Sequence, residues 1–255
     1  MIDIHAHILP GIDDGPETMN DSLSLLRYAR NNGITEIIAT PHYRPPRYPS
    51  GNIKNVYEEL NRRVHQEGLG LNIYLGSEIY LDESWQAGLT SVKCTTLGKT
   101  SYLLVELPEQ KIYPYHEKIL YEIQLQGYQI ILAHIERFNY FIKGPDYLQT
   151  LKDRGYYLQI NASSLLNRNT KKDALNLIRK GAVHFVASDC HNLGGRKPQM
   201  KEAYDLVRNE MGMEIAELLF RKNGANLLAN NPISEFSYEK KTHRGLFRRL
   251  LAPWK

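Results

Sequence analysis

Short apolar runs rich in β-branched residues alternate with helical patterns along most of the chain, and this alternation restricts its fold more than any other feature. Several helical patterns end at a glycine, where helices commonly stop. The pattern predicts strands over residues 2–8, 34–40, 72–80, 102–107, 129–135, 156–162 and 184–188, and helices over residues 22–31, 56–66, 115–126, 146–154, 172–180 and 199–229.

Such alternation predicts repeated βα units and a parallel sheet. About seven units in 255 residues favour one closed or nearly closed α/β barrel over two domains. A doubly wound open sheet is the alternative, and periodicity alone does not exclude it. We expect a single α/β domain over residues 1–235.

The formal charge of +4 raises the question of a nucleic-acid partner. Residues 239–255 contain six Lys or Arg and one Glu, so the rest of the chain has a net charge of −1. A near-neutral body argues against nucleic-acid binding. Residues 236–255, in which Phe247 and Trp254 are interleaved with arginines, are predicted to be a basic tail that is either solvated or in contact with an anionic membrane surface.

The sequence pattern predicts neither a membrane-spanning helix nor a signal peptide for export. The apolar runs fall short of the roughly 18 residues that a membrane-spanning helix needs, and the N-terminal sequence does not resemble a signal peptide. Cys94 and Cys190 lie far apart without CxxC spacing, which suits a reducing compartment. We expect a cytoplasmic protein.

Histidine and acidic residues recur where the predicted strands end. The C-terminal strand ends of a βα barrel meet at one rim, so these side chains should gather there. A single such residue usually has ordinary hydrogen-bond partners, but so many ionisable groups would repel one another without a cation. Imidazole mixed with carboxylate suits Mn, Fe or Zn, and the number of groups predicts two or three ions. The candidate ligands are His5, His7, Asp14, His42, Glu78, Glu106, His134, Asp189 and His191.

Two arginines follow these ligands closely. Arg137 lies three residues after His134, and Arg196 lies five after His191. Either could form a surface salt bridge, but beside a metal cluster the pair indicates binding of a phosphoryl group. Residues 43–48, Tyr-Arg-Pro-Pro-Arg-Tyr, form either a solvated loop or a contact for the ring and acidic neighbours of a substrate.

Cys190 and Arg196 also match the C-x5-R spacing of cysteine-dependent tyrosine phosphatases, in which a thiolate attacks phosphorus. Alternation along a strand places Cys190 opposite Asp189 and His191, so it should face away from the metals. We interpret Cys190 as buried and unreactive and Cys94 as structural. The cysteine-dependent mechanism stays as an alternative.

Six segments resemble, in order and spacing, the PHP (polymerase and histidinol phosphatase) superfamily, and more narrowly the metal-dependent tyrosine phosphatases of Gram-positive capsular and exopolysaccharide operons. The resemblance covers about residues 1–230 and implies a distorted (β/α)7 barrel with a trinuclear centre at the C-terminal strand ends, often loaded with manganese or iron. The segments are DIHAH at 3–7, DDG at 13–15, ATPH at 39–42, GSE at 76–78, HIER at 134–137 and SDCH at 188–191.

The resemblance also implies roles for residues and partners. The nine candidate ligands would bind the metals, and Arg137 and Arg196 would contact phosphate. The implied substrate is the phosphotyrosine-rich tail of a bacterial tyrosine kinase, which would bring the chain to the membrane through that kinase. Ile135 departs from the family, which usually has proline there, and this leaves the placement of Arg137 the least determined.

The mechanism that we hypothesise is in-line hydrolysis by a metal-bridging hydroxide, with both arginines stabilising the equatorial oxygens. His42 or a metal-bound water would protonate the leaving oxygen. Three further alternatives stay open: a PHP phosphoesterase acting on a small molecule such as histidinol phosphate, an amidohydrolase-type metal hydrolase, and a kinase-binding module with a vestigial site.

Overall fold

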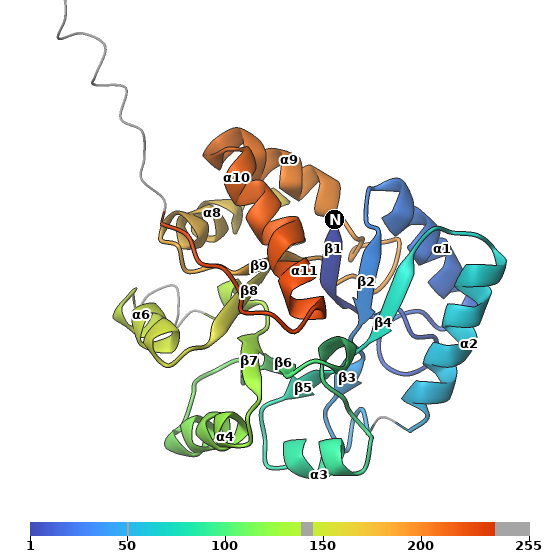
Figure 1. Ribbon diagram of the computed structural model, residues 1–255, viewed down its shortest axis with the longest axis horizontal. Helices are drawn as coiled ribbons and strands as arrows, with labels where there is room; N and C mark the ends of the chain where they lie inside the picture. Colours follow the sequence, from blue (N-terminus) through green and yellow to red (C-terminus); the bar gives the residue numbers. More distant parts are fainter. Residues whose placement is uncertain (50, 139–144, 238–255) are drawn as a thin grey trace, which may run out of the picture.

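The computed structural model describes residues 1–49, 51–138 and 145–237, and its strands form two parallel sheets (Figure 1). One sheet has the order β1-β2-β4 and the other the order β3-β5-β6-β7-β8-β9. The strands are β1 (Ile2–Ala6), β2 (Glu36–Ala39), β3 (His42–Tyr43), β4 (Asn72–Leu75), β5 (Glu78–Tyr80), β6 (Tyr102–Glu106), β7 (Gln129–Leu132), β8 (Tyr157–Asn161) and β9 (Phe185–Ala187).

The two sheets are parts of one curled surface. β2 is followed after two residues by β3, and β4 after two residues by β5, so the chain passes twice from one sheet into the other. Backbone hydrogen bonds continue through these breaks, from Gly76 N to Ala39 O (2.8 Å) and from Glu78 N to Pro41 O (3.1 Å).

The first strand lies beside the end of the last one. Asp189 N donates to His5 O at 2.9 Å, and His7 N donates to Cys190 O at 2.9 Å. Figure 1 shows the strands arranged around a common centre as a result. This curled parallel arrangement argues against the doubly wound open sheet, and it directs the C-terminal strand ends toward one another.

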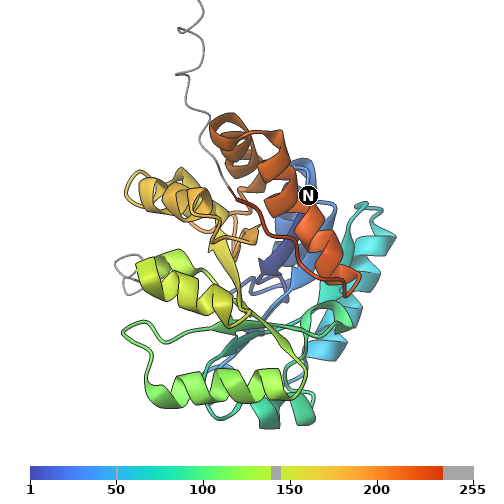
Figure 2. The ribbon, with the colours of Figure 1, turned by 60° about the vertical axis from the view of Figure 1, so that its left-hand side comes forward.

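Helices cover the outside of the curled sheet, as the two views in Figure 1 and Figure 2 show. A π-helical turn at Leu218–Lys222 and 3-10 turns at Leu97–Lys99 and Ile135–Arg137 complete the helical segments. The α-helices are α1 (Met19–Asn31), α2 (Ile53–Gln66), α3 (Trp85–Thr90), α4 (Pro114–Leu125), α6 (Pro145–Asp153), α7 (Ala162–Leu166), α8 (Lys171–Arg179), α9 (Met200–Met211), α10 (Met213–Glu217) and α11 (Asn223–Leu228).

Helix α1 illustrates how local sequence sets these elements. Thr18 caps its N-terminus by accepting from Asp21 N, and the Asp21 carboxylate accepts in turn from Thr18 N, a reciprocal capping box. The helix then buries Leu23, Leu25 and Leu26 against the sheet side of the molecule. A smaller apolar cluster, which includes residues of β1, β6, β7 and β9, joins Leu227 of α11.

The predicted strands and helices are confirmed, with most ends shifted by up to three residues. The predicted strand 72–80 is divided into β4 and β5 at Gly76, where a Cβ would lie 2.7 Å from Leu97 Cδ2, so the chain passes too close for a side chain. The predicted helix 199–229 is interrupted at Gly212, whose φ of +100° lies outside helical space. Helices α3 and α7 were not predicted.

The predicted basic tail, residues 236–255, falls from residue 238 onward outside the described residues. The two described residues of that range follow Glu235, whose carboxylate lies 3.5 Å from Lys152 Nζ. Among the helices that the structure describes, none is long and apolar enough to cross a membrane.

Candidate metal centre

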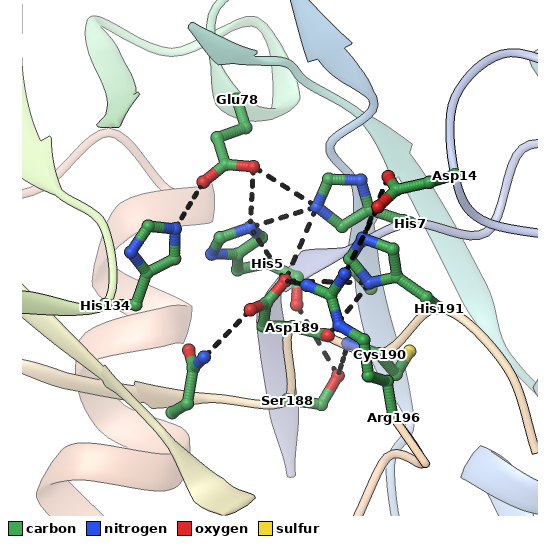
Figure 3. A network of polar contacts seen from close by, with 12 residues as sticks. His5, His7, Asp14, Glu78, His134, Ser188, Asp189, Cys190, His191 and Arg196 are labelled. Carbon is green, nitrogen blue, oxygen red and sulfur yellow. Dashed lines mark hydrogen bonds and ion pairs between the residues drawn. The ribbon is translucent and has the colours of Figure 1, made fainter. Parts of the chain in front are cut away.

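The nine predicted ligands lie together at the C-terminal strand ends. Figure 3 shows all of them except His42 and Glu106. Eight of them fall into three groups whose ligand atoms lie within 4.8 Å of one another. The ninth, His134, follows β7 and contacts Glu78 Oε1 through Nε2 at 2.8 Å. The groups are His7, Asp14, His42 and His191; His5, His7 and Asp189; and His42, Glu78 and Glu106.

The Glu78 carboxylate joins these groups. Its Oε2 lies 3.3 Å from Nε2 of His5, 3.3 Å from Nε2 of His7 and 2.9 Å from Nδ1 of His42. Nε2 of His5 and Nε2 of His7 are themselves 3.2 Å apart. Figure 3 shows the Glu78 carboxylate of β5 and the rings of His5 and His7, at the end of β1, directed at one another. Donor atoms separated by about 3 Å have the spacing of groups that share a metal ion bound at about 2 Å.

The other nitrogen of three imidazoles faces an acceptor. His5 Nδ1 lies 3.2 Å from Gln159 Oε1, His7 Nδ1 lies 2.6 Å from Asp13 Oδ2, and His191 Nδ1 lies 3.0 Å from a backbone carbonyl oxygen. Each Nδ1 therefore carries a hydrogen, and Nε2 is the nitrogen that can bind a metal. Metal-binding histidines commonly have this outer partner.

Eight buried side-chain polar atoms lack a hydrogen-bond partner among the described residues, and four of the eight belong to predicted ligands: Oε2 of Glu78, Oε2 of Glu106, Nδ1 of His134 and Nε2 of His191. Leaving buried polar atoms unsatisfied costs about 1–3 kcal/mol each. His191 Nε2 also lies 3.2 Å from the Asp14 carboxylate. The residues present therefore fit a group of metal ions, which would satisfy Glu78 Oε2, Glu106 Oε2 and His191 Nε2 at once, whereas His134 faces the cluster through Nε2.

The pKa shifts of the predicted ligands also indicate that the cluster needs positive charge. Burial, and next the Glu78 carboxylate, raise the pKa of Glu106 to about 7. Burial would lower the pKa of His42, but Glu78 and Asp14 outweigh burial and raise that pKa to about 11. Contacts with His191 and His42 hold the pKa of Asp14 well below its usual range. Protons on imidazole thus balance the carboxylates, and metal ions would displace those protons.

Two predicted ligands have strained backbone. His134 has a φ of +33° and Asp189 a φ of +51°, both in the left-handed region. This conformation costs a residue other than glycine roughly 1–2 kcal/mol. Neither residue continues its strand, and the turn directs both side chains toward the other ligands (Figure 3).

The two arginines predicted to bind phosphate meet at one carboxylate. Arg137 Nη2 donates to Asp189 Oδ2 at 2.5 Å, and Arg196 Nη2 donates to Asp189 Oδ1 at 2.9 Å. Arg196 Nη1 also lies 3.3 Å from Asp14 Oδ2. The arginine side chains are 45% and 35% exposed, whereas Asp189 is buried. Both guanidinium groups therefore lie between the buried ligands and solvent.

Cys190 is free and buried, as the sequence predicted, and Cys94 is also free and buried. Cys190 belongs to the main apolar core, and burial raises the pKa of its thiol. Burial also raises the pKa of Cys94 to about 12. A protonated thiol without solvent access is a poor nucleophile, so the C-x5-R alternative lacks its reactive group.

The loop at residues 43–48 borders the site. The Tyr48 ring stacks on His42, with centroids 5.2 Å apart and an interplanar angle of 13°. Arg44 lies 3.9 Å above the centre of the Tyr80 ring. The loop is thus anchored to a predicted ligand and to the strand that begins with Glu78.

Three further residues at the site were missed from the sequence: Asp13, Gln159 and Asn161. Asp13 belongs to the DDG segment at 13–15, in which the resemblance implies Asp14 as the ligand. Gln159 and Asn161 occupy the end of β8, which has no His, Asp or Glu. Their alternation as buried amides on an otherwise apolar strand was the available signal.

Comparison with known proteins shows the same fold and a shared family. YwqE of Bacillus subtilis, a tyrosine-protein phosphatase, is 34% identical over 97% of this chain and 99% of its own. CpsB of Streptococcus agalactiae, also a tyrosine-protein phosphatase, is 32% identical over 91% of this chain and 100% of its own.

A solved structure of a tyrosine phosphatase is also similar to this chain in fold and sequence. It comes from the work on YwqE of B. subtilis and CpsB of Streptococcus pneumoniae, described as unique metal-dependent tyrosine phosphatases, and has a TM-score of 0.86 and 33% identity over 94% of this chain and 100% of that chain. The family described as capsular polysaccharide synthesis, CpsB/CapC, matches residues 1–229. This chain is a member of the CpsB/CapC family.

Proposed function

We propose that this protein is a metal-dependent protein-tyrosine phosphatase. The observation that carries the proposal is the buried cluster of imidazoles and carboxylates with two arginines between it and solvent. The relatives named as tyrosine-protein phosphatases span nearly the whole chain and support the same activity.

The proposed metal content is two or three ions, with manganese first and iron or zinc as alternatives. The three ligand groups each contain at least one imidazole and one carboxylate, which supports these metals over calcium or magnesium. When bound, the ions supply Lewis acidity toward phosphate oxygens and acidify water.

The chain's own residues would bind and orient the phosphoryl group. Arg137 and Arg196 offer planar donor pairs whose present acceptor is the Asp189 carboxylate, and phosphate oxygens are equivalent acceptors. The leaving phenol has a pKa near 10, so it needs less protonation than an alcohol. His42, which is 14% exposed at the edge of the site, stays our candidate for any proton transfer to it.

A groove beside the centre favours a protein substrate over a small phosphate ester. It has a volume of about 460 Å³, and its lining includes Arg44, Tyr80, Lys111 and Tyr113. Tyr80 pairs with Glu106 in the sheet, so the groove adjoins the ligands. Lys111 Nζ lies 4.4 Å from the centre of the Tyr113 ring. Exposed rings and cations can contact peptide flanking a phosphotyrosine, and histidinol phosphate has no such flanks.

The partner that we propose is a tyrosine kinase that controls capsular or exopolysaccharide synthesis, in keeping with the family's description. For the fold, we propose a distorted (β/α)7 barrel. β2 with β3 and β4 with β5 then each count as one bent strand, and the backbone bonds between β1 and the end of β9 support closure.

The test combines elemental analysis with turnover of a phosphotyrosyl peptide before and after chelation. We expect metal in the active protein, loss of turnover on chelation, and recovery when manganese is added. Parallel assays with histidinol phosphate and with ester and amide panels separate the small-molecule and amidohydrolase alternatives. Turnover by metal-loaded His134→Ala protein equal to that of the unchanged protein would refute the proposed site.

A further inference from the structure

Strand β8 supplies none of the predicted metal ligands, yet it lies between two strands that lead into them. It pairs with β7, which is followed by His134, and with β9, which is followed by Asp189. Gln159 and Asn161, the amide pair, are fully buried near its end. We infer that the amide pair positions the ligands on both sides of β8, an inference that rests on the proposed metal centre.

The amide pair forms one directed chain of hydrogen bonds. His134 N donates to Gln159 Oε1, Gln159 Nε2 donates to Asn161 Oδ1, and Asn161 Nδ2 donates to Asp189 Oδ2, each at 2.8 Å. A backbone N–H can only donate, and an ionised carboxylate can only accept. Because the chain of hydrogen bonds begins at His134 N and ends at the Asp189 carboxylate, each of the two amides can adopt only one orientation.

The orientation of Gln159 determines which nitrogen of His5 carries the proton. His5 Nδ1 lies 3.2 Å from Gln159 Oε1, the oxygen that already accepts from His134 N. Since this oxygen cannot donate, His5 Nδ1 must carry a hydrogen. His5 Nε2 then directs its lone pair at the region that it shares with His7 and Glu78.

The amide pair also holds both strained ligands. Of the nine predicted ligands, His134 and Asp189 are the two with positive φ, and each is bound by one amide of the pair. The strand end is fixed as well, because Asn161 N donates to the buried Glu136 carboxylate at 2.9 Å. The side chains of Gln159 and Asn161 therefore bond only predicted metal ligands and each other among the described residues.

The experiment measures the metal affinity of chelator-treated protein carrying Gln159→Met, a change that keeps the length of the side chain and removes its hydrogen bonds with His134 N, His5 Nδ1 and Asn161 Oδ1. We expect manganese binding, measured by calorimetry, to weaken about 10-fold to 100-fold. The matched control is Gln129→Met on neighbouring β7, because Gln129 bonds Ser101 and Tyr157 rather than ligands. The control should bind manganese like the unchanged protein.

A variant that keeps only the acceptor separates positioning from stability. Gln159→Glu can still accept from His134 N and His5 Nδ1, so its manganese affinity should exceed that of Gln159→Met. A buried carboxylate should nevertheless make its metal-free form less stable to urea than Gln159→Met. Manganese affinities that fall in the same order as these stabilities would overturn the inference.

If Gln159→Met does not fold, Asn161→Ala tests the other end of the chain, and we expect it too to weaken manganese binding. Unchanged affinity in whichever of the two variants folds overturns the inference. Phosphotyrosyl-peptide turnover by the unchanged protein is measured separately. A protein whose manganese affinity depends on the amide pair but which lacks that turnover would refute the proposed function and leave the positioning role standing.

Discussion

Nδ1 of His7 lies 2.6 Å from Oδ2 of Asp13, and both side chains are fully buried. The same carboxylate accepts from His42 N at 3.0 Å and from Gly15 N at 3.0 Å. Asp13 thereby fixes the protonated nitrogen of one predicted ligand, the backbone of a second, and the loop that carries Asp14.

Asp13→Asn tests this arrangement, because an amide has one acceptor oxygen where the carboxylate has two. We expect manganese affinity to fall about 10-fold or more, measured by calorimetry on chelator-treated protein. Asp205→Asn on α9, which breaks an exposed pair with Lys201, is the control and should leave affinity unchanged. Asp13→Asn protein with the original affinity would show that the contact is dispensable.

Arg196→Lys keeps the positive charge and removes the planar donor pair. We expect kcat/KM for a phosphotyrosyl peptide to fall about 100-fold, and inhibition by inorganic phosphate to weaken, with metal content unchanged. Arg62→Lys, at the exposed pair with Glu59 on α2, is the control. Equal kcat/KM in the two variants would remove Arg196 from the phosphate site.

Cys190→Ser distinguishes metal-dependent from cysteine-dependent hydrolysis. The buried thiol has a raised pKa and no route to solvent, so we expect the folded, metal-loaded variant to retain turnover and to lose it on chelation. Loss of turnover without loss of metal, together with resistance of the unchanged protein to chelators, would favour the thiolate mechanism.

His184 predicts a pH dependence of stability away from the site. Burial, and next Lys152, lower the pKa of His184 from 6.5 to about 4, and its Nδ1 accepts from Leu158 N at 3.0 Å. The unfolded chain therefore binds this proton first, and about 3 kcal/mol of unfolding free energy is lost as pH falls from 6.5 to 4.

His184→Asn checks that dependence, since its oxygen can still accept from Leu158 N but does not titrate. Urea unfolding of metal-free protein at pH 7 and pH 4.5 should show a smaller loss of stability in the variant. His65→Asn at the exposed end of α2 serves as the control. If all three proteins lose the same free energy, His184 is not the group responsible.

The alternation of strands and helices could be predicted from the sequence, because hydrophobic periodicity and the glycines at helix ends are local properties. The gathering of the nine ligands was also predictable, since parallel strands bring their C-terminal ends to one rim. Their roles as ligands stay a prediction. The division at Gly76 was not predictable, because it depends on contact with Leu97, which is distant in sequence.

The outer partners of the ligands were harder to find for a related reason. Gln159 is an ordinary strand residue by its local pattern, and its importance comes from contacts with His5 on β1 and with His134 after β7. The meeting of Arg137 and Arg196 at Asp189 likewise depends on a left-handed turn that no local motif encodes.

The backbone bond from Asp189 to His5 joins the first strand to the segment that follows the last one, and this has a consequence for biosynthesis. A ribosome releases His5, His7 and His42 long before Asp189 and His191, so a partly made chain presents imidazoles without the carboxylate that lies among them. The two ligand groups that contain Asp189 or His191 can reach their final geometry only after the last strand has left the ribosome and paired with the first. We therefore expect any metal held by these two groups to be taken up late in folding.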